Sequence, residues 1–376
     1  MKSITILLLH MQYGGIEKQT ISLANELCKK YRVRIVSTYS MKAEPAYSVD
    51  PRVEVQYLIH DRPNRDAFVQ ALKGKRLWKA FCQGLKAARI LYLKKKRMIG
   101  AIKKLDTDYV LSTRIEYADM LSRYAPKGVV TITQEHLHDD SPAYVDWVKK
   151  AFRNLDYLVV LSQGSGENYG KWLEENRKIR LVEIPNILEA VPAESAPLQG
   201  NRLVAVGRLH PVKDFGTLLE VFARVRKQVP DATLALLGDG EERETLGARA
   251  EELGIGDAVE FKGMLSKERV TEEMLRSDVY VMTSLTECFP MVLLEAESCG
   301  LPLVSFDVPV GPRRILEDGV NGALIPDREI DRMADAIAEL LQNREKLAAF
   351  GRASKEKSYQ YTAEKIMPLW DALFEK

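Results

Sequence analysis

The sequence predicts an α/β protein made of two doubly wound domains, each built on a parallel sheet. Short runs rich in Ile, Val and Leu recur along the 376 residues, and stretches with helical spacing separate most of them. Continuous apolar runs are typical of strands buried on both faces, as in parallel sheets covered by helices. The alternation occurs twice, and a stretch rich in Pro and small residues at 186–201 divides the halves as an interdomain linker would.

The elements follow in order along the chain. Strands are expected in the first half at 4–9, 34–38, 109–112, 129–133 and 158–162, and in the second at 203–206, 233–237, 258–261, 279–283, 303–306 and 322–325. Helical spacing is clearest at 17–30, 215–228, 243–253, 292–298 and 332–342. The segment 362–374 predicts a terminal amphipathic helix with one apolar face, formed by Ile366, Leu369, Trp370 and Leu373.

These elements define an N-terminal domain at 1–190, a C-terminal domain at 198–358, and a segment at 359–376 expected to pack back on the N-terminal domain. Open α/β sheets bind ligands outside the carboxyl ends of their strands. Two such domains therefore predict a ligand cleft between them that draws residues from both.

Composition excludes several classes of protein. With 46% apolar and 29% charged residues, the chain is expected to be globular, neither disordered nor membrane-spanning. The apolar run Ile4–Leu9 is followed by Gly14-Gly15-Ile16-Glu17 in place of a signal-peptide cleavage site, so it predicts a buried strand. Four cysteines without CxxC spacing indicate neither a disulfide framework nor a zinc site, and favour a reducing cytoplasm.

The net charge of +2 conceals an uneven distribution. Residues 73–104 contain twelve Lys or Arg and no acid, which leaves −10 on the remaining 344 residues. On a helical wheel Trp78, Phe81, Leu85 and Tyr92 lie on one side, and most of the cations lie opposite. This pattern favours a helix in the interface of an anionic membrane. The alternative is a solvated helix whose apolar side packs on the first domain; nucleic acid is not expected, because no recognition module accompanies the segment.

The stretch from Ser284 to Pro302 is the most informative motif. Pro290 suits the first position of a helix, whose free N–H groups at Met291 and Val292 form an anion site. Glu287 precedes this helix and Glu295 lies just over one turn inside it. The pair brackets a phosphate with acceptors for hydroxyl groups, as a nucleotide sugar requires; the alternative is a helix cap and a solvated carboxylate.

Three further pieces follow strands of the two halves. Arg208 and Lys213 come directly after the first strand of the second half and are able to neutralise a diphosphate without metal, unless they are an ordinary surface pair. Gly14-Gly15 allow close approach of the backbone to an anion, or form an ordinary turn. His136 follows a strand at the cleft edge and is expected to donate a hydrogen bond to a sugar hydroxyl, or to be structural.

Together these pieces resemble glycosyltransferase family 4, whose members are retaining enzymes with the GT-B fold. The resemblance covers essentially the whole chain and is strongest from Glu287 to Glu295, with Phe289-Pro290 inside it, followed by Cys299-Gly300-Leu301-Pro302. The stretches at 305–314 and 317–322 look like the branch that builds bacterial surface polysaccharides. The family often has a small residue where this chain has Cys288, so the shape of the sugar pocket is left open.

The resemblance implies retention of configuration. The hypothesis for this chain is the transfer of a hexose or N-acetylhexosamine from a UDP-linked sugar to a lipid-linked saccharide, without metal or cofactor. The basic segment 73–104 is expected to hold the protein at the inner face of the cytoplasmic membrane. Glu295 is implied to hold the ribose, and Arg208 with Lys213 the diphosphate. The donor sugar is implied to contact Glu287, His136 and the backbone of Phe289, Pro290, Met291 and Val292. The remaining donor contacts are implied to be Gly14, Gly15, Gly238 and Met264.

Other patterns predict less. Asp106-Thr107-Asp108 matches a metal-binding DxD but precedes a strand, which puts it at the wrong end of the sheet. Gly164-Ser165-Gly166 lies mid-chain with the wrong spacing for a dinucleotide fingerprint, and His136-Leu137-His138 is a weak metal ligand set. The alternative functions are a phosphorylase or nucleotide-sugar hydrolase of the same fold, and a non-catalytic interaction module.

Overall fold

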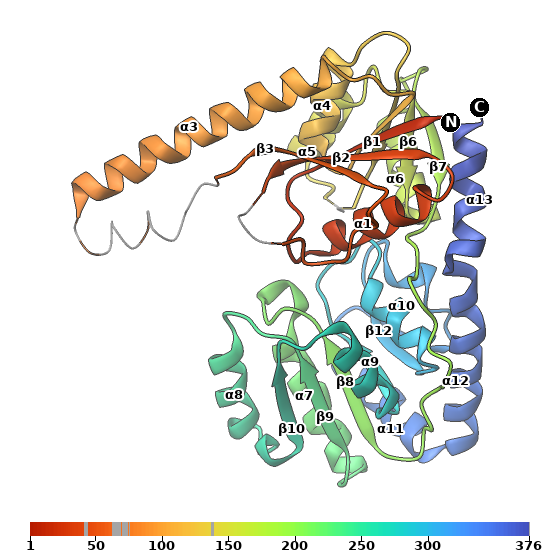
Figure 1. The fold of residues 1–376 in the computed structure, drawn as a ribbon. Coiled ribbons are helices and arrows are strands. Elements are labelled where there is room, and N and C mark those ends of the chain that lie inside the picture. The colour runs from red at the N-terminus through yellow and green to blue at the C-terminus, as the bar shows by residue number, and fades with distance from the viewer. Residues whose placement is uncertain (41–43, 62–68, 70–73, 75, 137–138, 376) are drawn as a thin grey trace. The chain divides into compact units, whose positions relative to one another are not determined.

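The computed structural model describes residues 1–40, 44–61, 69, 74, 76–136 and 139–375 (Figure 1). The chain divides into two compact units. The first unit comprises Met1–Leu161, Gly166–Ile184 and Leu369–Lys376, and the second comprises Ser162–Ser165 and Pro185–Pro368. Within the described residues, no helix has the length and apolar character needed to cross a bilayer.

The first unit is built on a parallel sheet with the strand order β3-β2-β1-β4-β5-β6-β7. Its strands are β1 Ser3–Leu8, β2 Arg32–Tyr39, β3 Glu54–Ile59, β4 Tyr109–Ser112, β5 Val130–Gln134, β6 Tyr157–Val160 and β7 Arg180–Glu183. The central strands β1, β4 and β6 are buried along their whole length, which explains their unbroken apolar character.

Helices connect these strands. They are α1 Gly15–Leu27, α3 Leu77–Ile102, α4 Ile115–Tyr124, α5 Pro142–Ala151 and α6 Gln163–Trp172. One core cluster joins β4 and β6 to α4, α5 and the carboxyl-terminal turns of α3, where Met98 and Ile102 are fully buried.

The second unit has a parallel sheet of order β10-β9-β8-β11-β12-β13. Its strands are β8 Arg202–Val206, β9 Thr233–Leu237, β10 Val259–Gly263, β11 Val279–Met282, β12 Leu303–Asp307 and β13 Gly322–Pro326. Its helices are α7 Phe215–Gln228, α8 Arg243–Glu252, α9 Lys267–Leu275, α10 Met291–Ser298, α11 Ile330–Gln342 and α12 Arg344–Ser358. The core lies between the sheet and helices that include α7 and α11.

The prediction of two doubly wound parallel-sheet domains is confirmed, and each of the eleven expected strands is present within two residues of its expected bounds. The structure adds β3 and β7, which close the two edges of the first sheet. The stretch at 186–201 packs on the second unit: Ile187, Leu188 and Ala196 are buried, and the Ala196 N–H donates to the Cys299 carbonyl.

The C-terminal helix α13 Ala363–Phe374 begins in the second unit, and its residues from Leu369 onward group with the first. There Trp370 and Phe374 are buried and stacked, and the Tyr31 hydroxyl donates to Asp371 at 2.6 Å. The chain passes between the units at Ile184/Pro185, a few residues before the expected boundary at 190.

Both sheets reverse their strand order once, between β1 and β4 in the first unit and between β8 and β11 in the second. At such a switch point the loops leave in opposite directions and open a crevice at the carboxyl ends of the strands. The loops that follow these four strands are therefore the places to look for a site.

Candidate functional site

The switch point of the second unit brings Lys213 and Glu287 together. Lys213 follows β8 and Glu287 follows β11, and Lys213 Nζ lies 2.5 Å from Glu287 Oε1 in a half-buried ion pair. The two loops are also joined through their backbones, because the Leu285 N–H donates to the Val212 carbonyl at 2.9 Å. Two residues singled out separately in the sequence are thus one cluster.

A small cavity of about 10 Å³, room for about one water molecule, lies at this point. Lys213, Ser284 and Val292 are among its lining residues, together with Tyr280. Burial raises the pKa of Tyr280 well above its usual range, and the charges of Glu287 and Glu295 add to the rise. Both carboxylates therefore lie near enough to Tyr280 to act on its hydroxyl group electrostatically.

Helix α10 starts beside this cavity. Pro290 is the residue before the helix, at φ −73° and ψ 95°, and Met291 is the first helical residue, so the expectation that Pro290 would be the first helical residue is off by one position. The difference is small because Pro290 still ends the loop with the φ that its ring imposes. The N–H groups of the first turn have no partner within the helix, which leaves an anion-binding end at Met291 and Val292.

The remaining predicted residues of the second unit have different surroundings. Phe289 is buried edge-to-face against Tyr361, with ring centroids 5.9 Å apart, so its side chain fills the core. Arg208 is exposed and forms no hydrogen bond or ion pair within the described part of the chain. Met264 is 68% exposed in the turn after β10.

Gly238 holds two strand ends together. Its φ of 134° is rare for residues with a side chain, and a Cβ there would lie 1.9 Å from the Gly207 carbonyl oxygen. The glycine thus brings the end of β9 against the turn that leads to Arg208.

Sequence reasoning missed Arg328, which follows β13 and contacts the loops that carry Lys213 and Glu287. Its guanidinium donates to Asp214 Oδ2 at 2.6 Å and to the carbonyls of Thr283 and Ser284 at 3.0 and 3.3 Å. It also stacks over the Phe306 ring, 4.9 Å from the centroid. A cation directly after a strand of this sheet was the available signal, but its partners lie far away in the sequence.

A strained loop covers Glu287. Val310 has a φ of 75°, unusual for a β-branched residue, and forms an isolated bridge with Glu287. A Cβ on the next residue, Gly311, would lie 2.7 Å from the Glu287 carbonyl oxygen. This close backbone contact fixes Glu287 from the side of β12.

In the first unit, the loop after β1 carries Gly14 and Gly15. A Cβ on Gly14 would lie 2.0 Å from a carboxylate oxygen of Glu17, which folds back over it, whereas a Cβ on Gly15 would meet nothing within 4 Å. Glu17 is 3% exposed although it lies in the first turn of α1. The positive end of the helix favours a carboxylate at this position.

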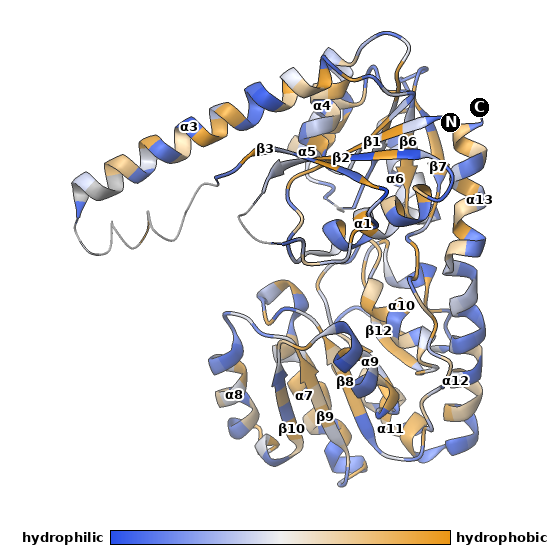
Figure 2. Ribbon diagram, in the orientation of Figure 1, coloured by the Kyte–Doolittle hydropathy of each residue, from blue (hydrophilic) through white to orange (hydrophobic). Residues whose placement is uncertain are grey.

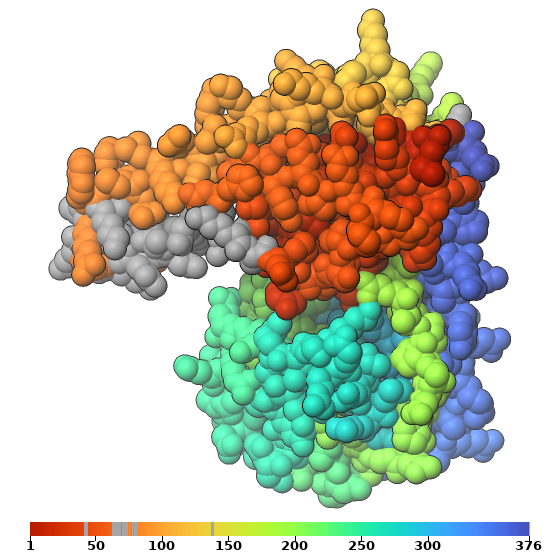
Figure 3. Space-filling model, viewed as in Figure 1, coloured from red at the N-terminus to blue at the C-terminus, as the bar shows by residue number. Residues whose placement is uncertain are grey.

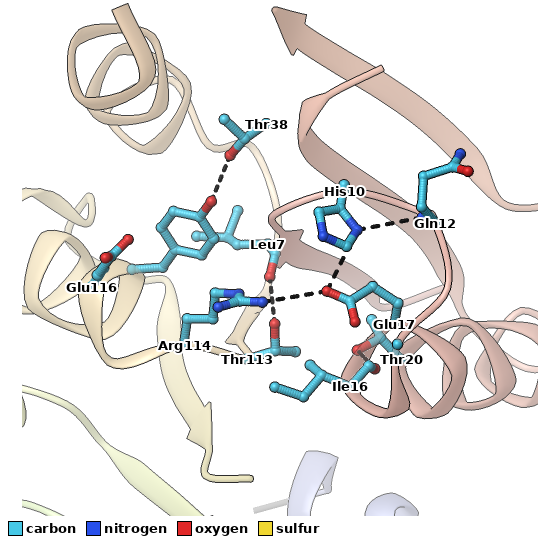
Figure 4. Close-up of polar contacts among 12 residues, drawn as sticks. Leu7, His10, Gln12, Ile16, Glu17, Thr20, Thr38, Thr113, Arg114 and Glu116 are labelled. Atoms are coloured by element: carbon cyan, nitrogen blue, oxygen red, sulfur yellow. Dashed lines mark hydrogen bonds and ion pairs between the residues drawn. The ribbon is translucent and has the colours of Figure 1, made fainter. Parts of the chain in front are cut away.

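Figure 4 shows that His10 and Arg114 both point toward Glu17. His10 Nδ1 lies 3.6 Å and an Arg114 guanidinium nitrogen 3.4 Å from Glu17 Oε1. His10 and Glu17 both follow β1 and Arg114 follows β4, so the cluster occupies the switch point of this sheet. Sequence reasoning missed all three residues; the signal was an acid directly after a glycine pair.

His136 and Glu135 follow β5 in the same unit. Burial, helped by the charge of Arg114, lowers the pKa of His136 to about 4, so the ring is neutral near pH 7. Its Nε2 is buried and has no hydrogen-bond partner among the described residues. Burial raises the pKa of Glu135 to about 7, although it accepts hydrogen bonds from Tyr144 at 3.1 Å and Thr133 at 3.3 Å.

Asp108 lies at the amino-terminal end of β4, as the sequence predicts, and its carboxylate accepts from the Ser3 N–H and hydroxyl at 2.7 and 2.8 Å. No group of three or more His, Cys, Asp or Glu suited to a metal ion occurs among the described residues. His138 lies outside them, as do Lys73 and Lys75 of the basic segment.

Residues 188–357 match the family described as Glycosyl transferases group 1. A lipopolysaccharide core biosynthesis glycosyltransferase, LpsE of Rhizobium meliloti, is 31% identical over 246 residues, which are 61% of this chain and 67% of the relative. An exopolysaccharide phosphotransferase of Streptomyces coelicolor is 29% identical over 384 residues. That match takes in 96% of this chain but only 39% of the relative's length.

Among solved structures, a mutant of S. aureus TarM in complex with Fondaparinux, alpha-GlcNAc-glycerol and UDP has a TM-score of 0.79 with this chain. The match covers 100% of both chains at 16% sequence identity. At that identity the likeness concerns the fold, which is GT-B.

Proposed function

We propose a donor, an acceptor and a stereochemical course for this chain, which belongs to the glycosyl transferases group 1 family and has the GT-B fold. The chain is a glycosyltransferase. In our proposal it transfers a hexose or N-acetylhexosamine from a UDP-sugar to a hydroxyl group of a lipid-linked saccharide, with retention of configuration and without a metal. We expect it to act at the inner face of the cytoplasmic membrane, in the synthesis of a cell-surface polysaccharide.

The observation that carries the proposal is the cluster at the switch point of the second sheet. Lys213 and Val292, at the start of α10, line one small cavity there. Glu287 is paired with Lys213, and Glu295 lies in the second turn of α10. Lysine and helix N–H groups bind phosphate, and carboxylates accept from the hydroxyl groups of ribose and hexose. A nucleoside diphosphate sugar carries all of these groups, with its two phosphates between the ribose and the hexose. UDP in the TarM complex supports the choice of nucleotide.

The reaction breaks the bond between the sugar C1 and the β-phosphate oxygen, and forms a bond between C1 and the acceptor oxygen. Positive charge develops on the sugar ring, and negative charge develops on the departing phosphate. Lys213, Arg208 and the N–H groups of Met291 and Val292 stabilise that negative charge. The acceptor proton passes to the departing phosphate, so no protein nucleophile is required.

The acceptor proposal rests on the relatives. The names of two matched proteins refer to lipopolysaccharide core and to exopolysaccharide, both of which are glycans of the bacterial surface. The neutral His136 and the buried Glu17 cluster of the first unit offer a donor and an acceptor for sugar hydroxyl groups.

The test is turnover by the purified full chain with UDP-, GDP- and ADP-sugars, with and without bacterial lipid extract. We expect nucleotide release from a UDP-sugar that rises with lipid extract, and a product whose anomeric configuration by NMR equals that of the donor. Lys213→Ala should lower the rate of release by about 100-fold to 1,000-fold, while Lys227→Ala, an exposed lysine of the same unit, should not. Release that is independent of any saccharide acceptor would identify a hydrolase, and phosphate-dependent release a phosphorylase. Donor binding without turnover would identify a non-catalytic module.

A further inference from the structure

Helix α3 of the first unit consists of two different halves. Its carboxyl-terminal half packs on the unit through Ile90, Met98 and Ile102, which are buried. Lys94 is paired with Glu116 of α4, and the Arg97 guanidinium donates to the Leu58 carbonyl of β3. Figures 1 and 3 show that the amino-terminal half extends beyond the rest of this unit.

The extended half exposes large apolar side chains. Trp78 is 77% exposed, Phe81 55%, Leu85 57% and Tyr92 63%, and Figure 2 shows the apolar positions alternating with hydrophilic ones along the helix. The rings of Trp78 and Phe81 are stacked, with centroids 5.7 Å apart. Spacings of three, four and seven residues place all four on one stripe, called here the aromatic stripe.

The aromatic stripe faces away from the protein. At about 100° per residue, its mean direction lies about 150° from that of the series that packs on the unit, Ile90, Lys94, Met98 and Ile102. The alternative, that the apolar side of this segment packs on its own domain, therefore does not hold for the amino-terminal half. Contiguous exposed apolar surface of this kind marks an interaction site.

The charges that border the aromatic stripe indicate what kind of partner it binds. Exposed Arg89, Lys95 and Lys96 border the stripe, and the Lys96 ammonium lies 5.8 Å from the centre of the Tyr92 ring. No acid occurs in residues 73–104, so pairing of two such arms would bring like charges together. Aromatic side chains bordered by cations match the boundary between acyl chains and anionic headgroups of a bilayer.

We propose that the arm formed by residues 78–92 of α3 inserts its aromatic stripe into the interface of an anionic lipid membrane. The arm brings the first unit to the surface that holds the lipid-linked acceptor, so this role rests on the proposed function, although membrane binding itself does not require catalysis. Lys94, Met98 and Ile102 anchor the arm to the protein.

Flotation with phosphatidylglycerol-containing and pure phosphatidylcholine vesicles tests the proposal in the full chain without donor. The wild type should float only with anionic vesicles and be released by high salt. The double variant Trp78→Ala/Phe81→Ala should bind at least about tenfold more weakly, and Trp147→Ala, an exposed tryptophan in α5 of the same unit, should bind as the wild type does. Equal flotation of the double variant, or equal binding to both vesicles, would overturn the proposal.

Gel filtration identifies the rival partner, a second copy of the chain. A dimer that the double variant dissociates, without flotation of the wild type, would overturn the membrane proposal. Calorimetric titration of UDP in lipid-free solution keeps the two proposals separate: UDP affinity should be unchanged in the double variant if the arm serves only membrane binding.

A second inference comes from backbone strain. The described non-glycine residues with positive φ are Leu198, Asp214, Val310 and Arg328. Asp214 and Arg328, at φ 47° and 65°, are joined by the 2.6 Å ion pair, and Val310 lies beside Glu287. Strained residues persist where surrounding contacts fix them, and they cluster at functional sites.

The bonds of Arg328 explain what this strain maintains. Its guanidinium holds the carboxylate that caps α7, directly after Lys213, and the carbonyls that begin the loop to Glu287. The Thr283 hydroxyl also links the two loops, because it donates to the carbonyls of Lys213 and Asp214 at 3.2 and 3.0 Å. The structure assigns Arg328 as a positioning residue that holds the Lys213 and Glu287 loops in register for the donor diphosphate.

This inference also rests on the proposed function, and its test uses donor kinetics. Arg328→Ala should lower kcat/KM for the donor by about 10-fold to 100-fold and leave KM for the acceptor unchanged. Guanidinium ions should restore part of the rate, and Arg328→Lys should be intermediate because lysine lacks the planar fork. Arg332→Ala, an exposed arginine nearby in sequence, is the control. A fall in melting temperature with unchanged kcat/KM and no guanidinium rescue would show a purely structural role.

Discussion

The carboxyl edges of the two sheets are built differently. At the switch point of the second unit, the loops are bound to each other by the Lys213–Glu287 pair and by Arg328, with bonds of 2.5–3.3 Å. At that of the first unit, His10 and Arg114 lie 3.6 and 3.4 Å from Glu17, and Arg114 Nε and His136 Nε2 are buried without a partner among the described residues.

The two edges differ in whether their buried polar groups find hydrogen-bond partners within the protein. Buried polar groups are normally hydrogen-bonded, so we expect a ligand or water to bind the nitrogens that the first edge leaves without a partner. An edge that satisfies its own groups is organised before the ligand arrives and retains little freedom to lose on binding. We therefore interpret the second edge as the preorganised site for the donor diphosphate, and the first as the adaptable side that meets sugar hydroxyl groups.

The largest effect should come from removing the cation of the preorganised edge. Lys213→Ala removes one of the two cations proposed to stabilise the departing phosphate and should lower kcat by about 100-fold to 1,000-fold. Initial rates of nucleotide release measure the loss. A reduction of less than about threefold would mean that Lys213 serves only its ion pair with Glu287.

Next comes the dependence of stability on pH in the first unit. The pKa of Glu135 is about 7 in the folded protein against an ordinary value of 4.5, so the folded state keeps a proton that the unfolded state releases. The contribution of Glu135 to the free energy of unfolding therefore falls by about 3 kcal/mol in all as pH rises from about 4.5 to 7. Above pH 7 it is constant. Glu135→Gln should match the wild type near pH 4 and be more stable at pH 8. Chemical denaturation at both pH values measures the difference; a constant difference would contradict this reasoning.

A smaller effect is expected from Glu17→Gln, which keeps the size of the side chain and removes its charge. The loss of the ion pairs with His10 and Arg114 should raise KM for the acceptor by about tenfold and leave the affinity for UDP unchanged. Glu26→Gln, in the last turn of the same helix, is the matched control. If UDP affinity fell while acceptor KM did not change, the assignment of the first edge would be reversed.

The smallest effect concerns Gly15. A Cβ there meets nothing within the described protein, so Gly15→Ala should leave the melting temperature unchanged or slightly raised. If the backbone approaches the donor phosphate as the sequence predicts, KM for the donor should still rise about fivefold. Gly170→Ala in α6, where a Cβ likewise has open space, should change stability alone. Identical kinetics for the two variants would place Gly15 away from the donor.

The same contrast explains what the sequence could predict. The second edge was found because Lys213 and Glu287 lie in contiguous motifs that each follow a buried strand. The cluster of the first edge was missed because His10 and Arg114 lie in the loops that follow two different strands, and an acid at the start of a helix is commonplace. Arg328 was missed because only the fold brings it to Asp214.

The fold itself was predictable wherever strands are buried on both faces. The edge strands β3 and β7 are partly exposed, so their apolar runs are broken. The amphipathic pattern of α3 likewise indicated an apolar face without indicating what covers it. The similar pattern of α13 ends in a buried Trp370, at 1% exposure, whereas Trp78 is exposed.

Calorimetric titration of UDP tests the central claim, that the edge of the second sheet holds the donor nucleotide. The wild type and Glu252→Ala, which changes an exposed glutamate of α8, should bind one UDP with equal affinity, and Glu17→Gln should bind it equally well. Glu295→Ala should bind UDP at least about tenfold more weakly if its carboxylate holds the ribose, as we propose. Undiminished binding by Glu295→Ala, or an equal loss in Glu17→Gln, would contradict the account.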